Sequence, residues 1–214
     1  MLRTIASVCL IILNFTLCAQ TDELGQLASR LDKTKDVKGY QQLAESFSRI
    51  ADTRKTDWLP YYYAAFCNAR VGWLYQDEGE QIEPYADKGQ EQINKALSLL
   101  DTSRQKKELS EVYCVLSMVN RARVYINPAT YGRKFGPLAS RYIQMAKAAN
   151  PDNPRALYLE GWEKYFTPKM WGGDKAKAKE ILQAAKQKFD GQGVGGAGQP
   201  HWGRQDVEDL LAKK

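Results

Sequence analysis

Apolar residues recur at helical spacing along almost the whole chain, and no segment shows the alternating pattern of a half-buried strand. The spacing predicts helices over residues 22–31, 37–51, 58–75, 80–100, 105–126, 137–149, 155–166, 175–189 and 204–212. Residues 127–136 contain Pro128, Gly132 and Gly136, so we expect a loop there, with one helical turn at most. The fold class is therefore predicted to be all-α.

Four of these helices share one face, made of a small residue, a mid-sized residue four positions later and an alanine three positions beyond that. The sets are Ala44/Ser48/Ala51, Gly89/Ile93/Ala96, Ala139/Ile143/Ala146 and Ala178/Leu182/Ala185. Offsets of four and three place each set on one helix face, where small side chains let another helix approach closely. The preceding helices offer Ala65, Ser117 and Gly161 at the matching positions. This repetition predicts antiparallel helical hairpins stacked as a short α-solenoid.

The repeated face resembles the tetratricopeptide repeat (TPR). The last unit matches best: Ala156, Leu157 and Gly161 fit the first helix, and Ala178, Leu182 and Ala185 fit the second. Pro151 fits the turn that closes the preceding unit. The connections are longer than in the family pattern and Tyr165 falls one position late, so the repeats are degenerate. The resemblance covers residues 38–189 and implies a TPR-like solenoid.

A second resemblance is local. Residues 168–178, with Gly172, Gly173 and Asp174 at the turn, are similar to a segment of TPR-like exported bacterial proteins, which include the periplasmic partner of TRAP-type solute transporters. That resemblance implies a periplasmic helical body with a ligand cavity. A sharp glycine turn followed by an aspartate cap also explains the segment on physical grounds alone.

The amino terminus resembles an export signal. Arg3 precedes a mostly apolar stretch that ends at Leu17-Cys18-Ala19, which predicts cleavage before Gln20 and a periplasmic or secreted protein. The alternative is a lipoprotein anchored to a membrane at Cys18, although Leu17 is larger than the residue that usually precedes a lipidated cysteine. The predicted divisions are a signal peptide (1–19), a TPR-like helical domain (20–190), a glycine-rich linker (191–203) and a C-terminal helix (204–214).

The distribution of charge and of cysteines argues against a nucleic-acid partner and against a metal site. The formal net charge is +6 at pH 7, but the basic residues are spread along the chain rather than gathered as a nucleic-acid-binding face requires. Cys67 and Cys114 lie in apolar helical runs and are predicted to be buried thiols, with a disulfide as the alternative. With one histidine, His201, elsewhere in the chain, they do not form the pattern of a metal site.

No arrangement of residues indicates catalysis. His201 has no nucleophile or acid at a telling position, and Glu160 and Glu163 lie on one helix without a motif around them. We therefore expect a binding protein, without catalytic residues, cofactor or metal, rather than an enzyme.

The candidate binding surface follows from the aromatic helix over residues 58–75. Aromatic residues circle this helix, so they cannot all enter one core, and tyrosine and tryptophan are frequent in binding grooves. The residues predicted to line a partner groove are Trp58, Tyr61, Tyr62, Arg70, Asn120 and Arg123. Core packing and ordinary ion pairs are the alternatives for these side chains. The function expected from this surface is a scaffold for a protein or peptide partner, and the alternative is a small-molecule-binding accessory of a solute transporter.

Overall fold

The computed structural model describes residues 23–193, 196 and 198–213, and every regular element in these ranges is helical. The predicted signal peptide and Cys18 lie outside the described residues. A helix over residues 23–30 precedes the labelled elements. These are η1 (Leu31–Lys33), α2 (Val37–Thr53), α3 (Trp58–Leu74), η2 (Gly79–Gln81), α4 (Glu83–Ser98), α5 (Lys106–Ile126), α6 (Tyr131–Ala149), α7 (Pro154–Phe166), η3 (Lys169–Trp171), α8 (Lys175–Gly191) and α9 (Arg204–Ala212).

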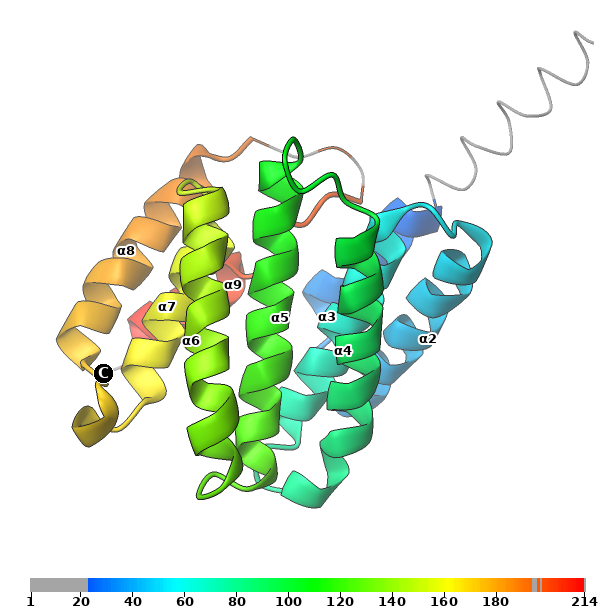
Figure 1. Cartoon of the computed structure of the whole chain (residues 1–214). Coiled ribbons are helices and arrows are strands. Elements are labelled where there is room, and N and C mark those ends of the chain that lie inside the picture. Colours follow the sequence, from blue (N-terminus) through cyan, green and yellow to red (C-terminus); the bar gives the residue numbers. More distant parts are fainter. Residues whose placement is uncertain (1–22, 194–195, 197, 214) are drawn as a thin grey trace, which may run out of the picture.

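Consecutive helices pack as hairpins, and the hairpins stack side by side. Helix α3 packs against α4, α5 against α6, and α7 against α8, while α3 also contacts α5 and α5 contacts α7. Figure 1 shows α4, α6 and α8 on one side of the stack, with α9 behind α7 on the other side. The predicted all-α fold of stacked helical hairpins is confirmed.

The small-residue faces lie at the contacts between helices. Except for the half-buried Ser48, all residues of the four repeated sets are buried. A Cβ atom added to Gly161 would lie 2.7 Å from Cγ of Leu182 on α8. One added to Gly89 would lie 3.1 Å from a methyl carbon of Val119 on α5. These distances leave little or no room for a larger side chain, so the close approach predicted from the sequence is present.

The helix starts that the sequence predicts at residues 58 and 175 are confirmed. The Asp57 carboxylate accepts a hydrogen bond from the amide of Leu59 at the start of α3, over 3.1 Å. The Asp174 carboxylate accepts one from the amide of Lys177 at the start of α8, over 2.9 Å. Each cap satisfies a backbone donor that the first turn of a helix leaves without a partner.

The expected loop over residues 127–136 is partly wrong, because α6 begins at Tyr131 instead of Pro137. The amide of Tyr131 donates to the carbonyl of Asn127 over 2.8 Å, which starts the helix early. Burial of Phe135 then gives the first turns of α6 an apolar anchor. Tertiary packing therefore outweighs the local helix-breaking tendency of proline and glycine in this segment. The helix expected over residues 80–100 is also divided, into η2 and α4.

The C-terminal segment is part of the common core. The Trp202 side chain is 6% exposed, and its ring centroid lies 4.8 Å from that of Phe66 on α3. Val207 and Leu210 on α9 are buried in the same core cluster. Trp202 therefore docks on the helical body. In the described part of the chain, no helix combines the length and the apolar character that a membrane span needs.

We predict that Gly161→Ala lowers the free energy of unfolding by about 1–3 kcal/mol, because the new methyl group collides with the buried Leu182. Gly132→Ala on α6 is the matched control, since a Cβ there would lie 3.9 Å from Val124 Cγ1, which is an ordinary contact, and alanine suits a helix better than glycine. Urea titration followed by circular dichroism measures both. Equal stability of the two variants would contradict the close contact between α7 and α8.

Candidate functional site

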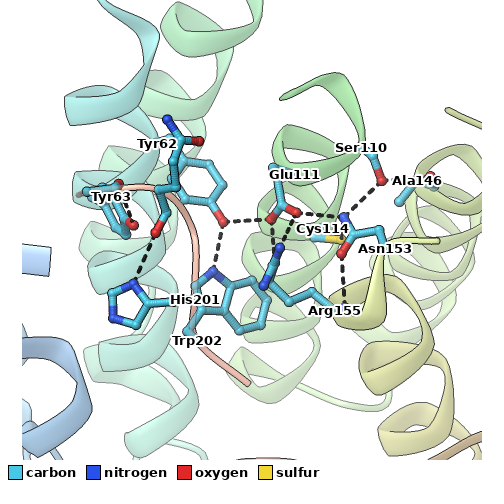
Figure 2. Close-up of polar contacts among 12 residues, drawn as sticks. Tyr62, Tyr63, Ser110, Glu111, Cys114, Ala146, Asn153, Arg155, His201 and Trp202 are labelled. Atoms are coloured by element: carbon cyan, nitrogen blue, oxygen red, sulfur yellow. Dashed lines mark hydrogen bonds and ion pairs between the residues drawn. The ribbon is translucent and has the colours of Figure 1, made fainter. Parts of the chain in front are cut away.

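A buried carboxylate, Glu111 on α5, connects the inner helices. It receives two hydrogen bonds from the Arg155 guanidinium of α7, from Nε and Nη2, each over 2.7 Å. The amide nitrogen of Asn153 donates to it over 2.8 Å and the hydroxyl of Tyr62 over 3.0 Å. Figure 2 shows these side chains converging on the carboxylate from three directions. Both partners of the ion pair are buried, so these donors replace the water that the charge has lost.

The same network reaches the C-terminal segment and α6. The indole nitrogen of Trp202 donates to the Tyr62 hydroxyl over 2.7 Å. On the other side, Asn153 donates to the Ser110 hydroxyl, which donates to the Ala146 carbonyl over 2.8 Å (Figure 2). One set of buried polar groups therefore joins α3, α5, α6, α7 and the chain before α9. We refer to Tyr62, Ser110, Glu111, Asn153, Arg155 and Trp202 as the Glu111 network.

Electrostatics keep the members of this network in fixed protonation states. Burial opposes the charge of Arg155, but the Glu111 carboxylate outweighs it and leaves the pKa of Arg155 above its usual value. Burial first, and then the charge of Glu111, raise the pKa of Tyr62 well above its usual value. The Tyr62 hydroxyl thus stays protonated and remains a donor to Glu111. We interpret the network as structural, since it fixes the helices whose ends form the site described next.

The candidate site is an open cavity of about 260 Å³, which we call the aromatic cleft. It lies where α3, α5 and α7 end, and Lys213, just after α9, contributes one wall. Its lining residues are Arg70, Trp73, Leu74, Gln76, Tyr125, Trp162, Phe166 and Lys213. Hairpin stacking makes α3, α5 and α7 point the same way, so their carboxyl-terminal ends meet at this place.

Three aromatic rings form a continuous series in the cleft. The ring centroids of Trp73 and Trp162 lie 4.6 Å apart, and those of Trp162 and Phe166 lie 4.8 Å apart. The Trp73 indole nitrogen donates to the Met118 carbonyl over 2.9 Å, which fixes the ring on α5. Leu74 and Phe166 are 41% and 46% exposed, so apolar surface continues from the cleft to the outside.

Cationic groups border the rings. Lys213 Nζ lies 5.3 Å from the centre of the Phe166 ring. Arg70 Nη1 lies 3.4 Å from a carboxylate oxygen of Asp206 on α9. Burial opposes the charge of Arg70, but Asp206 outweighs it and leaves the pKa of Arg70 above its usual value. Arg70 therefore remains a cation beside the cleft.

Arg121 and Tyr125 complete the polar side of the site. Arg121 forms an ion pair with Glu163 over 3.0 Å and lies 5.9 Å from the centre of the Trp162 ring, which helps hold that ring in place. Burial raises the pKa of Tyr125 to about 12, so its phenol is neutral at physiological pH. In the described part of the chain, no three His, Cys, Asp or Glu side chains gather closely enough to bind a metal ion.

The six residues predicted to line a groove do not lie together. Arg70 lines the aromatic cleft. Tyr62 belongs to the Glu111 network, and Asn120 is buried with its amide donating to the Leu116 carbonyl inside α5. These two side chains face the core rather than a partner.

The remaining three predicted residues lie elsewhere. Tyr61 is half-buried against the main core, and Arg123 pairs with Asp87 on α4 over 2.7 Å. Trp58 borders a second cavity, of about 710 Å³, next to the glycine-rich segment. The cleft residues Trp73, Trp162 and Phe166 were missed, because their helical spacing is equally typical of core positions.

The second cavity is a weaker candidate than the aromatic cleft. Glycine, charged and amide residues form much of its lining, and residues 194, 195 and 197 of the adjacent segment are outside the described structure. Several of its polar side chains already have partners: His201 lies 3.2 Å from Asp32, and Arg204 bonds to Asp190 and to the Phe189 carbonyl. Arg155 and Glu111 on its border are committed to each other.

Comparison with solved structures gives a clear match. The HusA haemophore from Porphyromonas gingivalis superposes with a TM-score of 0.77 and is 31% identical, over 89% of this chain and 90% of that chain. The chain belongs to the HusA family. HusA itself is a haemophore. No protein-family model and no curated protein matches the chain, so the resemblance to TPR and TRAP-associated proteins gains no support beyond the stacked hairpins.

We predict that Glu111→Gln destabilises this HusA-family protein by about 3–5 kcal/mol, because Arg155 would remain buried without its counter-charge. Glu91→Gln on α4, which replaces an exposed carboxylate, is expected to change stability by less than about 0.5 kcal/mol. Urea titration followed by tryptophan fluorescence reports both values, and Trp202 makes the signal sensitive to the network. Parental stability of Glu111→Gln would contradict the structural role of the ion pair.

Alkaline pH is also expected to destabilise the protein. Burial raises the pKa of the Cys67 and Cys114 thiols and of the Tyr62, Tyr63 and Tyr158 phenols. At alkaline pH these groups keep their protons in the folded protein but lose them in the unfolded chain. Their contribution to stability is therefore fully present below the pKa values of the unfolded chain, and the free energy of unfolding falls above about pH 9–10. The urea midpoint of reduced protein should be the same at about pH 7 and pH 8 and lower at about pH 10.5. An unchanged midpoint at the highest pH would contradict the burial of these groups.

Proposed function

We propose that this protein binds haem or a related tetrapyrrole in the aromatic cleft and acts outside the cytoplasm without catalysis. The family relationship supports the proposal, since the related structure is that of a haemophore. The observation that carries it is the meeting of three aromatic rings and two cationic groups in one cleft. A tetrapyrrole presents a flat apolar ring with carboxylate groups at its edge, which is the complementary chemistry.

The flat faces of the ligand would pack against the aromatic series. Trp73, Trp162 and Phe166 offer a large rigid apolar surface, and aromatic groups bind other ring systems through offset stacking. Apolar burial would supply most of the affinity, at about 25 cal/mol for each Å² removed from water.

The carboxylates of the ligand would approach Arg70 and Lys213. A guanidinium group forms bidentate hydrogen bonds with a carboxylate, and a lysine adds a more mobile positive charge. These two residues lie on α3 and just after α9, so carboxylates at one edge of the ring could reach both while the ring packs against the aromatic series.

The cleft is large enough to enclose only part of a tetrapyrrole. Ligand pockets that enclose drug-sized molecules have volumes of about 300–1,000 Å³, and the cleft has about 260 Å³. We infer that part of the tetrapyrrole enters the cleft, while the rest covers the exposed sides of Leu74 and Phe166. Partial enclosure suits a carrier that must both capture a ligand and release it.

A protein partner remains a second proposal. Met170 and Trp171, in the turn that follows α7, are 80% and 72% exposed, which is unusual for side chains of this size. This turn comes shortly after Phe166 in the chain, so a receptor that contacts it would be close to the bound ligand. The proposed place of action rests on the predicted signal peptide, and the mass of the mature amino terminus distinguishes cleavage before Gln20 from lipidation at Cys18.

We predict that Phe166→Ala weakens haem binding by about tenfold to a hundredfold, because burying a phenylalanine side chain contributes about 1.5–3 kcal/mol. Stability should change little, since the side chain is almost half exposed. Leu138→Ala on α6 removes another exposed apolar side chain, one that does not line the cleft, and should bind haem like the parent. Titration of haem followed by its absorbance measures the affinities. Equal loss in both variants would indicate unspecific adsorption and overturn the proposed site.

A further inference from the structure

Asp206 on α9 forms an ion pair with Arg70, the cation that would bind a carboxylate of the ligand. Its Oδ1 lies 3.4 Å from Arg70 Nη1, and Arg70 lines the aromatic cleft. We propose that Asp206 competes internally with carboxylate-bearing ligands for Arg70, so that it limits the affinity of the cleft for them. This inference rests on the proposed function, because it concerns how the same cleft selects among tetrapyrroles.

The contacts of Arg70 indicate that a ligand carboxylate could replace Asp206. Its contact with Asp206 is longer than the 2.7–2.9 Å that is usual for a charged N–H···O hydrogen bond. Its Nε is buried and has no hydrogen-bond partner. Arg70 Cζ also lies 5.5 Å from the centre of the Tyr40 ring, and Arg70 interacts with the hydroxyls of Tyr40 and Tyr158, so these two side chains hold the guanidinium in place. A guanidinium has five N–H donors, and the one on Nε is used by none of these partners.

The position of Asp206 makes it mobile enough to give way. Its side chain is one-third exposed, so it can turn toward water when another carboxylate takes its place. Helix α9 would stay attached, because Val207 and Leu210 are buried in the core on the same helix. While Asp206 remains at Arg70, its charge repels an approaching carboxylate and cancels part of the attraction of the cation.

This arrangement distinguishes two kinds of tetrapyrrole. A ligand with free carboxylates has to displace Asp206 or bind beside it, and its affinity is reduced accordingly. A ligand whose carboxylates are esterified relies on the aromatic rings alone and is not affected by Asp206. The charge at residue 206 therefore controls selectivity between acid and ester forms of one ring system.

The test compares Asp206→Asn with the parent protein, using deuteroporphyrin IX and its dimethyl ester as probes. Asparagine keeps the shape of the side chain and removes its charge. We expect the variant to bind the diacid about threefold to tenfold more tightly and to bind the diester within about twofold of the parent. Quenching of the protein's tryptophan fluorescence by the porphyrin measures all four affinities, because Trp73 and Trp162 line the cleft.

Asp209→Asn is the matched control, since Asp209 is exposed on the same helix and bonds to Gln205 rather than to Arg70. It makes the same change in net charge, so it should leave both affinities within about twofold of the parent. The inference alone is overturned if the parent binds both porphyrins and Asp206→Asn shows no gain for the diacid, or an equal gain for the diester. The same gain in Asp209→Asn would also overturn it, because the effect would then be one of net charge. A parent protein that binds neither porphyrin would overturn the proposed function, and the inference with it.

Discussion

The buried carboxylate of Glu111 has to be fully hydrogen-bonded, and this requirement determines how the inner helices lie. An unpaired charge in the core would be destabilising by several kcal/mol, so Arg155, Asn153 and Tyr62 must all reach it at once. They come from α7, its cap and α3. Trp202 joins through Tyr62 and brings the C-terminal segment to the same place. The small-residue faces make this convergence possible, because they let the hairpins approach closely enough for short polar contacts.

The aromatic cleft is a consequence of the same arrangement. Once α3, α5 and α7 are aligned side by side in one direction, their last turns form a common surface, and Trp73 and Trp162 meet there although they are far apart in the sequence. Helix α9 then crosses behind α7 and brings Asp206 and Lys213 to the border of the cleft (Figure 1). The ion pair in the core and the cleft at the helix ends thus both depend on the same alignment of α3, α5 and α7.

The fold could be predicted from the sequence to a large extent, because its signals are local. The repeated small-residue faces and the cap at Asp174 depend on patterns within one or two helical turns. The start of α6 could not be predicted, since burial of Phe135 outweighs the proline and glycine signals around it. The candidate site was predicted only at Arg70. Its other residues come together only when the ends of three helices meet in the folded structure. In the sequence, aromatic residues at helical spacing have the same pattern whether they enter a core or line a cleft.

Hydrogen–deuterium exchange with and without haem tests the central claim most directly, which is that the ligand binds where α3, α5 and α7 end. We expect haem to slow exchange in the last turns of these helices and in α9, and to leave residues 198–201, which line the second cavity, unchanged. Protection confined to residues 198–201, or no protection in any part of the chain, would contradict the account.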